Sequence, residues 1–175
     1  MTLFHGRFRI ESSRLKGWDY SSNGRYFITI CTNNRKHYFG NVNNGSMHLS
    51  EIGEIAQKFW IDIPNHFPAA GLDEIIVMPN HIHGIVVIDK CGHGRNDCRD
   101  AACGVSTTTD NHITTLGRII NSYKSAVSNI CHKNGFEFAW QSRYHDHIIR
   151  DIKSLNRIRK YIIDNPAKWA DDRNY

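Results

Sequence analysis

The sequence predicts an α+β fold in which helices pack against a mostly antiparallel sheet. Short runs of β-branched and aromatic residues alternate with segments of helical periodicity in the order β-α-β-β-α-β-α. Two of the runs are joined by a short Pro79-Asn80 turn, which favours an antiparallel hairpin. The sequence contains no internal repeat, and it shows no sign of a second domain. This order of elements is typical of ferredoxin-like and RRM-like folds.

Residues 1–24 are interpreted as a basic N-terminal arm, and residues 25–175 as a single domain. Arginines are interleaved with aromatic residues in the arm, which ends in Ser-Ser-Asn-Gly. Such a segment can hold a nucleic-acid strand by charge and stacking. Arg14 and Trp18 are the candidates for gripping a flanking base. An arm that lies along the domain surface is an equally good interpretation.

The first half of the domain contains three predicted strands and one helix. Ser50 is the expected N-cap of a helix over residues 51–63, whose apolar stripe belongs to the core and which Pro64 is expected to end. Residues 33–44 are rich in turn formers. The strands are predicted over residues 26–32, 72–78 and 81–88.

The second half begins with residues 89–112, which lack periodicity and are predicted to form a long variable loop. Apolar residues at helical spacing then predict a helix over residues 115–132, which Gly135 closes. A last helix is predicted over residues 152–165, before Pro166. Extended segments are predicted between these helices, over residues 136–140 and 144–150.

The positive charge is concentrated in the last third of the chain. The net charge is +5, with 11 basic and 11 acidic residues up to residue 112, and 11 basic against 6 acidic residues from 113 onward. A one-sided excess of this kind suits a polyanionic partner, although a solvated basic face would look the same.

The cysteine content and the apolar pattern predict a cytoplasmic protein. No apolar stretch is long enough to span a membrane, and the N-terminal residues show no apolar signal core. An odd number of irregularly spaced cysteines indicates reduced thiols and no disulfide framework. They are Cys31, Cys91, Cys98, Cys103 and Cys131.

His81 and His83 flank a single isoleucine at the start of a predicted strand. Residues i and i+2 of a strand point to the same face, so the two imidazoles are expected to project together. Two such nitrogens can hold a divalent metal and leave coordination positions open for a substrate. Ordinary surface histidines, or hydrogen-bonded histidines of the core, would fit the same pattern.

Tyr161 lies on the last predicted helix, next to its apolar stripe, and Asn165 follows one turn later. A metal at His81 and His83 could polarise a phosphodiester, and the Tyr161 hydroxyl could attack its phosphorus. The Asn165 amide oxygen could reach the same metal. An exposed structural tyrosine is the alternative for Tyr161.

Two other tyrosines are interpreted as structural. Tyr123 lies on the apolar stripe of its helix. Tyr144 alternates with His145 and His147 along an extended segment, so it is expected to point inward while these histidines share the other face.

The histidine stretch also resembles a known motif. Residues 78–85 read Met-Pro-Asn-His-Ile-His-Gly-Ile. This stretch resembles the His-hydrophobe-His (HUH) motif of single-tyrosine transposases of the insertion-sequence 200/605 type, and most closely that of the REP-associated tyrosine transposases. The resemblance covers nearly the whole chain. Further similar fragments occupy residues 26–32, 60–67, 116–125, 140–150 and 161–169.

The resemblance implies an HUH endonuclease palm that cuts and rejoins single-stranded DNA beside a hairpin, through a 5′-phosphotyrosine link and with Mg²⁺ or Mn²⁺. By motif position it implies Tyr161 as the nucleophile and His81 and His83 as metal ligands. Asn165 is implied as the third ligand, at a position where the mobile-element branch typically has Gln.

The expected partner is single-stranded DNA with hairpin or palindromic elements, and both a monomer and a homodimer remain open. Lys124, Arg143 and Arg150 are the candidates for phosphate contacts, with solvated surface as the alternative for each. Two other functions are compatible with the sequence. One is a non-catalytic, RRM-like nucleic-acid-binding module, and the other is a metal-dependent nuclease that uses water as the nucleophile.

Overall fold

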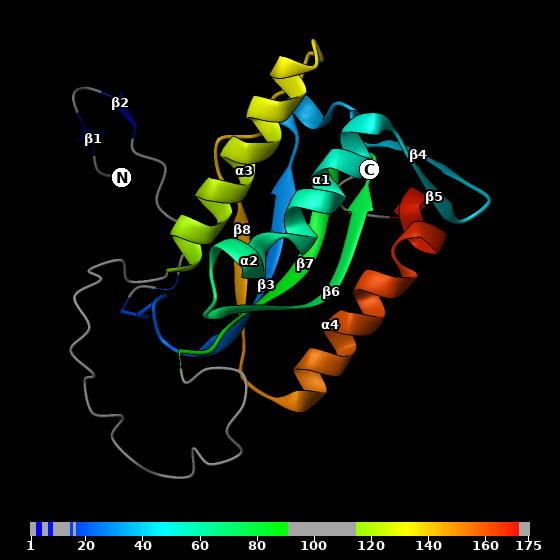
Figure 1. The fold of residues 1–175 in the computed structure, drawn as a ribbon. Helices are drawn as coiled ribbons and strands as arrows, with labels where there is room; N and C mark the ends of the chain where they lie inside the picture. Colours follow the sequence, from blue (N-terminus) through cyan, green and yellow to red (C-terminus); the bar gives the residue numbers. More distant parts are fainter. Residues whose placement is uncertain (1–2, 5–6, 9–14, 16, 91–114, 172–175) are drawn as a thin grey trace.

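The computed structural model describes residues 3–4, 7–8, 15, 17–90 and 115–171. Its centre is a four-stranded sheet with the order β6-β7-β3-β8, in which all neighbouring strands are antiparallel (Figure 1). Strands β3 and β6 flank β7, and β7 and β8 flank β3, which is the interleaved arrangement of a ferredoxin-like fold. The predicted fold class is confirmed. The strands are β3 (Gly24–Cys31), β6 (Ala70–Met78), β7 (His81–Ile88) and β8 (His145–Ile149).

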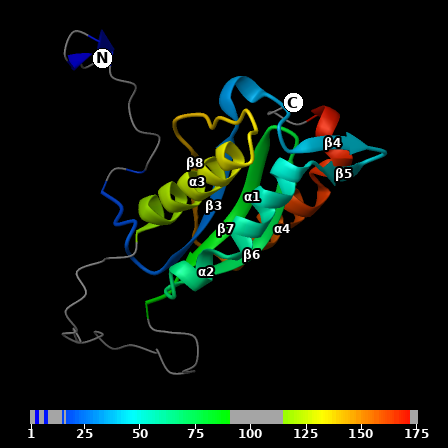
Figure 2. The same ribbon diagram turned by 45° about the horizontal axis from the view of Figure 1, so that its top comes forward.

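The helices form a layer on each face of the sheet (Figure 2). Helices α1 (Glu51–Ile61) and α3 (Leu116–Lys133) pack together on one face, and α4 (Ile152–Asp164) covers the other. The short helix α2 (Ile63–His66) follows α1. None of the helices in the described part of the chain is long and apolar enough to cross a membrane.

Alternation along β3 separates the two layers. Tyr26, Ile28 and Ile30 are fully buried in the larger core beneath α1 and α3. Phe27 and Thr29 point to the opposite face, because successive side chains of a strand alternate. The smaller core on that face joins the sheet to α4 and consists of Ile85, Ile149, Leu155, Ile158 and Ile162, with Phe27 and Ile76 packed against it.

The helix prediction for residues 51–63 is wrong at its end. Ser50 caps α1 as expected, accepting a hydrogen bond from the Gly53 backbone N–H at 3.2 Å. However, α1 ends at Ile61, and Pro64 lies in the first turn of α2. Proline is accommodated there because the first helical N–H groups have no partner within the helix.

A hairpin within and after the predicted turn-rich region was missed. Strands β4 (Gly40–Asn43) and β5 (Ser46–Leu49) pair antiparallel, and both residues of the Asn44-Gly45 turn have positive φ. Asn-Gly is a strong hairpin signal in the sequence, because this turn type requires positive φ at both central positions.

Four smaller findings complete the description of the elements. The predicted extended segment 136–140 forms no strand, although Trp140 makes an isolated bridge to Thr32. Near the N-terminus, β1 (Leu3–Phe4) pairs with β2 (Arg7–Phe8), and most of the other arm residues up to position 16 lie outside the described residues. The predicted loop over residues 89–112 also lies almost entirely outside them. The last element of the described part of the chain is a 3-10 segment, η2 (Pro166–Asp171).

Gly84 allows β7 to approach α1 closely, in the strand that carries the two histidines. A Cβ at this position would overlap the indole of Trp60, whose side chain is fully buried. We expect Gly84→Ala to lower the free energy of unfolding by about 1–3 kcal/mol, measured by urea denaturation, because the indole cannot move without disturbing the core. Trp60→Phe in the same chain should recover part of this loss. If the loss of unfolding free energy in the double variant equals the sum of the losses in the two single variants, this explanation is contradicted.

Candidate functional site

His81 and His83 lie side by side on the face of β7 that α4 covers. Their exposed fractions are 0% and 2%, and their ring centroids are 4.4 Å apart. The register of the sheet places Cys31 opposite His81 and Thr29 opposite His83 on β3. The sequence prediction that the two rings project together from one strand is therefore confirmed.

Each ring has a hydrogen-bonding partner at Nδ1. The Nδ1 of His81 lies 2.8 Å from Oδ1 of Asn80, and the Nδ1 of His83 lies 2.9 Å from Oγ1 of Thr29. Because an amide oxygen can only accept, the contact with Asn80 calls for a proton on Nδ1 of His81. Such partners set the orientation and the protonated nitrogen of a metal-binding histidine.

Tyr161 comes from α4 and meets the histidines directly. Its hydroxyl lies 3.1 Å from Nε2 of His83, and the two ring centroids are 5.2 Å apart. The phenol remains 41% exposed, so one side of it faces solvent. Phe27 contacts both rings, with centroid distances of 5.2 Å to His83 and 6.1 Å to Tyr161. The structure thus brings together residues that are 78 positions apart in the sequence.

Two kinds of contact hold α4 in the position that presents Tyr161. The apolar stripe of Leu155, Ile158 and Ile162 packs onto the sheet. On the flank of the helix, the Arg159 guanidinium donates two hydrogen bonds to the carboxylate of Asp73 on β6, at 2.8 and 2.6 Å. Hydrogen bonding from Arg159 lowers the pKa of Asp73, although burial alone would raise it.

The Asp73–Arg159 pair should make stability depend on pH. Because the folded state lowers the Asp73 pKa, the stabilisation is present above the unfolded value of about 3.9 and is lost as pH falls through the folded value. We expect Asp73→Asn to lower Tm by a few degrees at pH 7, with the two proteins converging below pH ~4. Glu137→Gln, which removes an exposed pair with Lys36, should have little effect. A constant gap at every pH would contradict this assignment.

Asn165 is the C-cap of α4, one turn after Tyr161, and is 2% exposed. The chain then turns into η2, where the Trp169 ring stacks on His81 at a centroid distance of 5.8 Å. The C-terminal end of α4 and the segment after it therefore close over the histidine pair.

The side chains at this site fit a divalent cation in chemical type. The two imidazoles, together with the Asn165 amide oxygen that the sequence predicts as a third ligand, would form a mixed nitrogen and oxygen donor set, which suits Mn²⁺ better than Mg²⁺, since Mg²⁺ prefers oxygen. Within the ranges that the structure describes, no group of three or more His, Cys, Asp or Glu side chains is arranged to hold a metal ion.

The structure describes four of the five predicted DNA-contacting residues, and they come from different parts of the fold. Arg14 lies outside the described residues, and Arg143 is exposed in the loop before β8. Trp18 is half-buried and donates its Nε1 hydrogen to the hydroxyl of Tyr26 at 3.3 Å. Lys124 lies on α3 and donates to the backbone oxygen of Gln141 at 2.6 Å. Burial lowers the pKa of Lys124. Arg150 is exposed directly after β8 and lies at a hollow near α4.

The two rival tyrosines occupy structural positions, as predicted. Tyr123 is 3% exposed and donates a hydrogen bond to the backbone oxygen of Ala56 at 3.0 Å. Burial raises its pKa well above the usual value. Tyr144 is half-buried and packs against the larger core.

Sequence reasoning missed four residues that surround the site: Phe27, Thr29, Asn80 and Trp169. The alternation along β3 indicates that Phe27 and Thr29 share a face, but the sequence does not show which face or which partners. Asn80 adjoins the histidine stretch, so its proximity was visible although its bond to His81 was not. No local pattern links Trp169 to His81.

Comparison with known proteins identifies a family and a fold. The chain is 38% identical over 166 residues to an uncharacterized protein of Haemophilus influenzae, covering 94% of this chain and 92% of that protein. The chain belongs to the same family as that protein. No family model matches the present chain.

The fold is also found in a solved complex. A REP-associated tyrosine transposase bound to a REP hairpin matches with a TM-score of 0.59 and 18% identity, over 91% of this chain and 74% of that one. The protein therefore has the α+β fold of this transposase, with a four-stranded antiparallel sheet and helices on both faces.

Proposed function

We propose that the protein is a transposase-like, single-stranded DNA endonuclease and strand transferase that uses Tyr161 as its nucleophile. The contact of 3.1 Å between the Tyr161 hydroxyl and Nε2 of His83 carries this proposal. It joins the helical tyrosine to the histidine pair, which are the two halves that the motif resemblance implies. The fold shared with a REP-associated tyrosine transposase adds support.

In the proposed reaction, the Tyr161 hydroxyl attacks a backbone phosphorus of the DNA. A bond forms between phosphorus and the phenolic oxygen, and the bond from phosphorus to the 3′ oxygen breaks. The phenol proton passes to water, and the released 3′ oxygen takes up a proton. Attack by a second 3′-hydroxyl reverses these steps and joins a new strand without ATP, because the phosphotyrosine ester conserves the bond energy.

His81, His83 and Asn165 are the proposed holders of Mg²⁺ or Mn²⁺. When bound, the ion would polarise a phosphodiester oxygen and offset the negative charge that develops at phosphorus. Asn80 and Thr29 would orient the two imidazoles for this purpose, through the contacts at Nδ1. Phe27 would limit the positions of the Tyr161 and His83 rings by packing against both.

The proposed partner is single-stranded DNA that carries a hairpin. The similar transposase was solved bound to a REP hairpin, which supports a hairpin as the substrate. An open, RRM-like sheet for stacking bases is less compatible with the architecture, because α4 covers the face that carries Phe27. A hydrolytic nuclease with water as nucleophile leaves the Tyr161–His83 contact without a role.

The test uses the full chain, 5′- and 3′-labelled oligonucleotides that carry a hairpin with single-stranded flanks, and Mn²⁺ or Mg²⁺. Products are separated on denaturing gels and treated with protease. The proposal expects a protein–DNA adduct on the fragment with the new 5′ end, and a free 3′-hydroxyl on the other fragment. Cleavage with 5′-phosphate ends and no adduct would favour the hydrolytic nuclease instead.

A further inference from the structure

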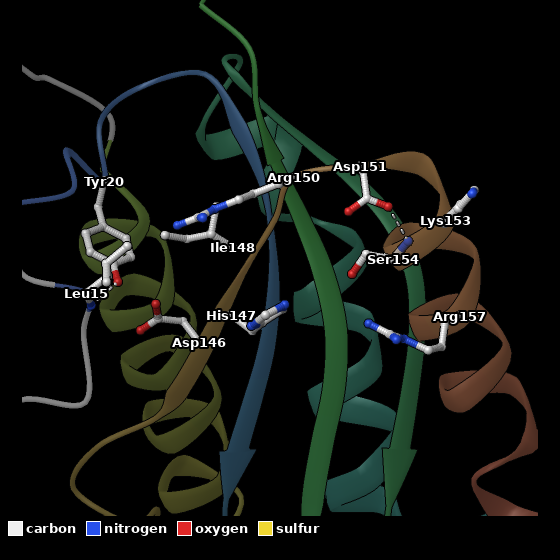
Figure 3. A pocket seen from close by; sticks show the side chains of 10 residues that line it. All are labelled: Leu15, Tyr20, Asp146, His147, Ile148, Arg150, Asp151, Lys153, Ser154 and Arg157. Carbon is white, nitrogen blue, oxygen red and sulfur yellow. Dashed lines mark hydrogen bonds between the residues drawn. The ribbon is translucent and has the colours of Figure 1, made fainter.

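The outer edge of strand β8, which pairs with no further strand among the described residues, lines a hollow of about 820 Å³ that the site described above does not include (Figure 3). Because β8 is the outermost strand, residues from both of its faces reach the hollow. Asp146, Leu15 and Tyr20 lie on one side of the strand, and His147 and Arg157 lie on the other. A volume of this size is within the range of about 300–1,000 Å³ that is typical of small-ligand sites.

Asp146 is the unusual group in this hollow. Its side chain is 8% exposed, and its Oδ1 accepts no hydrogen bond from the described residues. An ionised carboxylate can only accept, and a buried acceptor without a donor is costly. A ligand that brings hydrogen-bond donors to this position would remove that cost. The half-buried ring of Tyr20 and the exposed side chain of Leu15, which line the hollow beside Asp146, offer flat or apolar surface for such a ligand.

The rest of the hollow is cationic. Arg150, Lys153 and Arg157 line it, and the carboxylate of Asp151 is engaged in capping α4 through the Ser154 backbone N–H at 2.8 Å. Arg157 precedes Tyr161 by four residues on α4, which is about 6 Å of helical rise. The cationic side of the hollow therefore lies next to the proposed nucleophile.

We propose that this hollow binds one nucleotide of the single-stranded DNA beside the cut, with a guanine base at Asp146 and its phosphate at Arg150 and Arg157. Guanine presents two adjacent donors, N1–H and N2–H, which match the two oxygens of a carboxylate. Adenine and cytosine present an amino group without a neighbouring N–H, and thymine presents a single imide N–H. Unstacked bases are commonly read by their Watson–Crick edges and by stacking on aromatic rings. The inference rests on the proposed function for its choice of DNA as ligand.

The experiment measures binding of the full chain to short oligonucleotides in EDTA, where no cleavage is expected. Each is oligo(dT) with dG, dI, dA, dC or dT at the centre, and affinity is followed by fluorescence anisotropy. We expect the dG oligonucleotide to bind about tenfold more tightly than the dT one. Inosine lacks the N2 amino group and should lose most of this gain. Equal affinities, or a preference for another base, would overturn the proposal without any protein variant.

Asp146→Asn tests the residue. We expect it to bring the ratio of dG to dT affinity close to one, while Glu137→Gln, which changes an exposed carboxylate elsewhere, keeps the wild-type ratio. A dG preference that survives Asp146→Asn, in a variant with a normal unfolding transition, would overturn the assignment. A dG preference without any covalent adduct in the cleavage assay would contradict the proposed function but support the guanine site. An adduct without a dG preference would support the proposed function but contradict the guanine site.

Discussion

Tyr161→Phe is expected to abolish the protein–DNA adduct and to reduce cleavage of hairpin oligonucleotides by about 1,000-fold or more. The substitution removes only the hydroxyl that would form the bond to phosphorus, and loss of a nucleophile is among the largest single effects in catalysis. The phenyl ring that remains should keep the packing against Phe27 and His83, so folding should be unaffected. Adduct formation is measured on denaturing gels, and folding by thermal unfolding.

Tyr38→Phe is the matched control for this variant. Tyr38 is half-buried and packs against Phe138, in the layer of the molecule away from α4. Its phenol should be dispensable for cleavage. If Tyr161→Phe still forms the adduct, another residue is the nucleophile; if it still cleaves without an adduct, water is the nucleophile. Either result would remove Tyr161 from the proposed role.

His81→Ala and His83→Ala are each expected to reduce cleavage by about 100-fold or more at limiting Mn²⁺. Each removes one of two imidazole nitrogens from a small donor set, and even the groups that only orient metal ligands commonly contribute about 10–100-fold. Chelation of the metal should abolish wild-type cleavage, and added Mn²⁺ should restore it. Mn²⁺ binding, measured by calorimetry without DNA, should weaken in both variants, which separates a metal ligand from a purely structural histidine.

His66→Ala serves as the control for the histidine variants. His66 lies on α2 with 65% of its side chain exposed, and it pairs with Asp62. It should retain wild-type cleavage and Mn²⁺ affinity. Full Mn²⁺ affinity in His81→Ala and His83→Ala, together with lost cleavage, would show that these residues act on DNA or on Tyr161 and do not bind the metal.

The order of the elements could be predicted because each helix or strand buries residues at its own regular spacing in the sequence. The sequence shows alternation at Tyr26, Phe27 and Ile28, and it shows helical spacing around Leu155 and Ile158. The two cores confirm both patterns. The prediction was wrong where two local signals competed. Pro64 can end one helix or begin another, and only the packing of α1 and α2 on the sheet decides between these roles.

In the predicted site, too, local spacing predicted some features and not others. That His81 and His83 share a face followed from their spacing. The sequence resemblance also singled out Tyr161 as their partner, although no spacing rule connects residues so far apart. The buried carboxylate of Asp146 shows the limit, because its alternation with His145 and His147 was visible but the hollow at the sheet edge was not.

The sequence by itself determined the fold class, the pairing of the two histidines on one strand and the structural role of Tyr123. These depend on contacts between near neighbours in the chain, whose geometry follows from the period of a helix or a strand. Only the tertiary structure decided that Thr29 and Asn80 hold the histidines, that Trp169 stacks on His81, and that the Tyr161 hydroxyl lies 3.1 Å from His83. These contacts depend on strand register and on the seating of α4, which are set by the packing of the whole core.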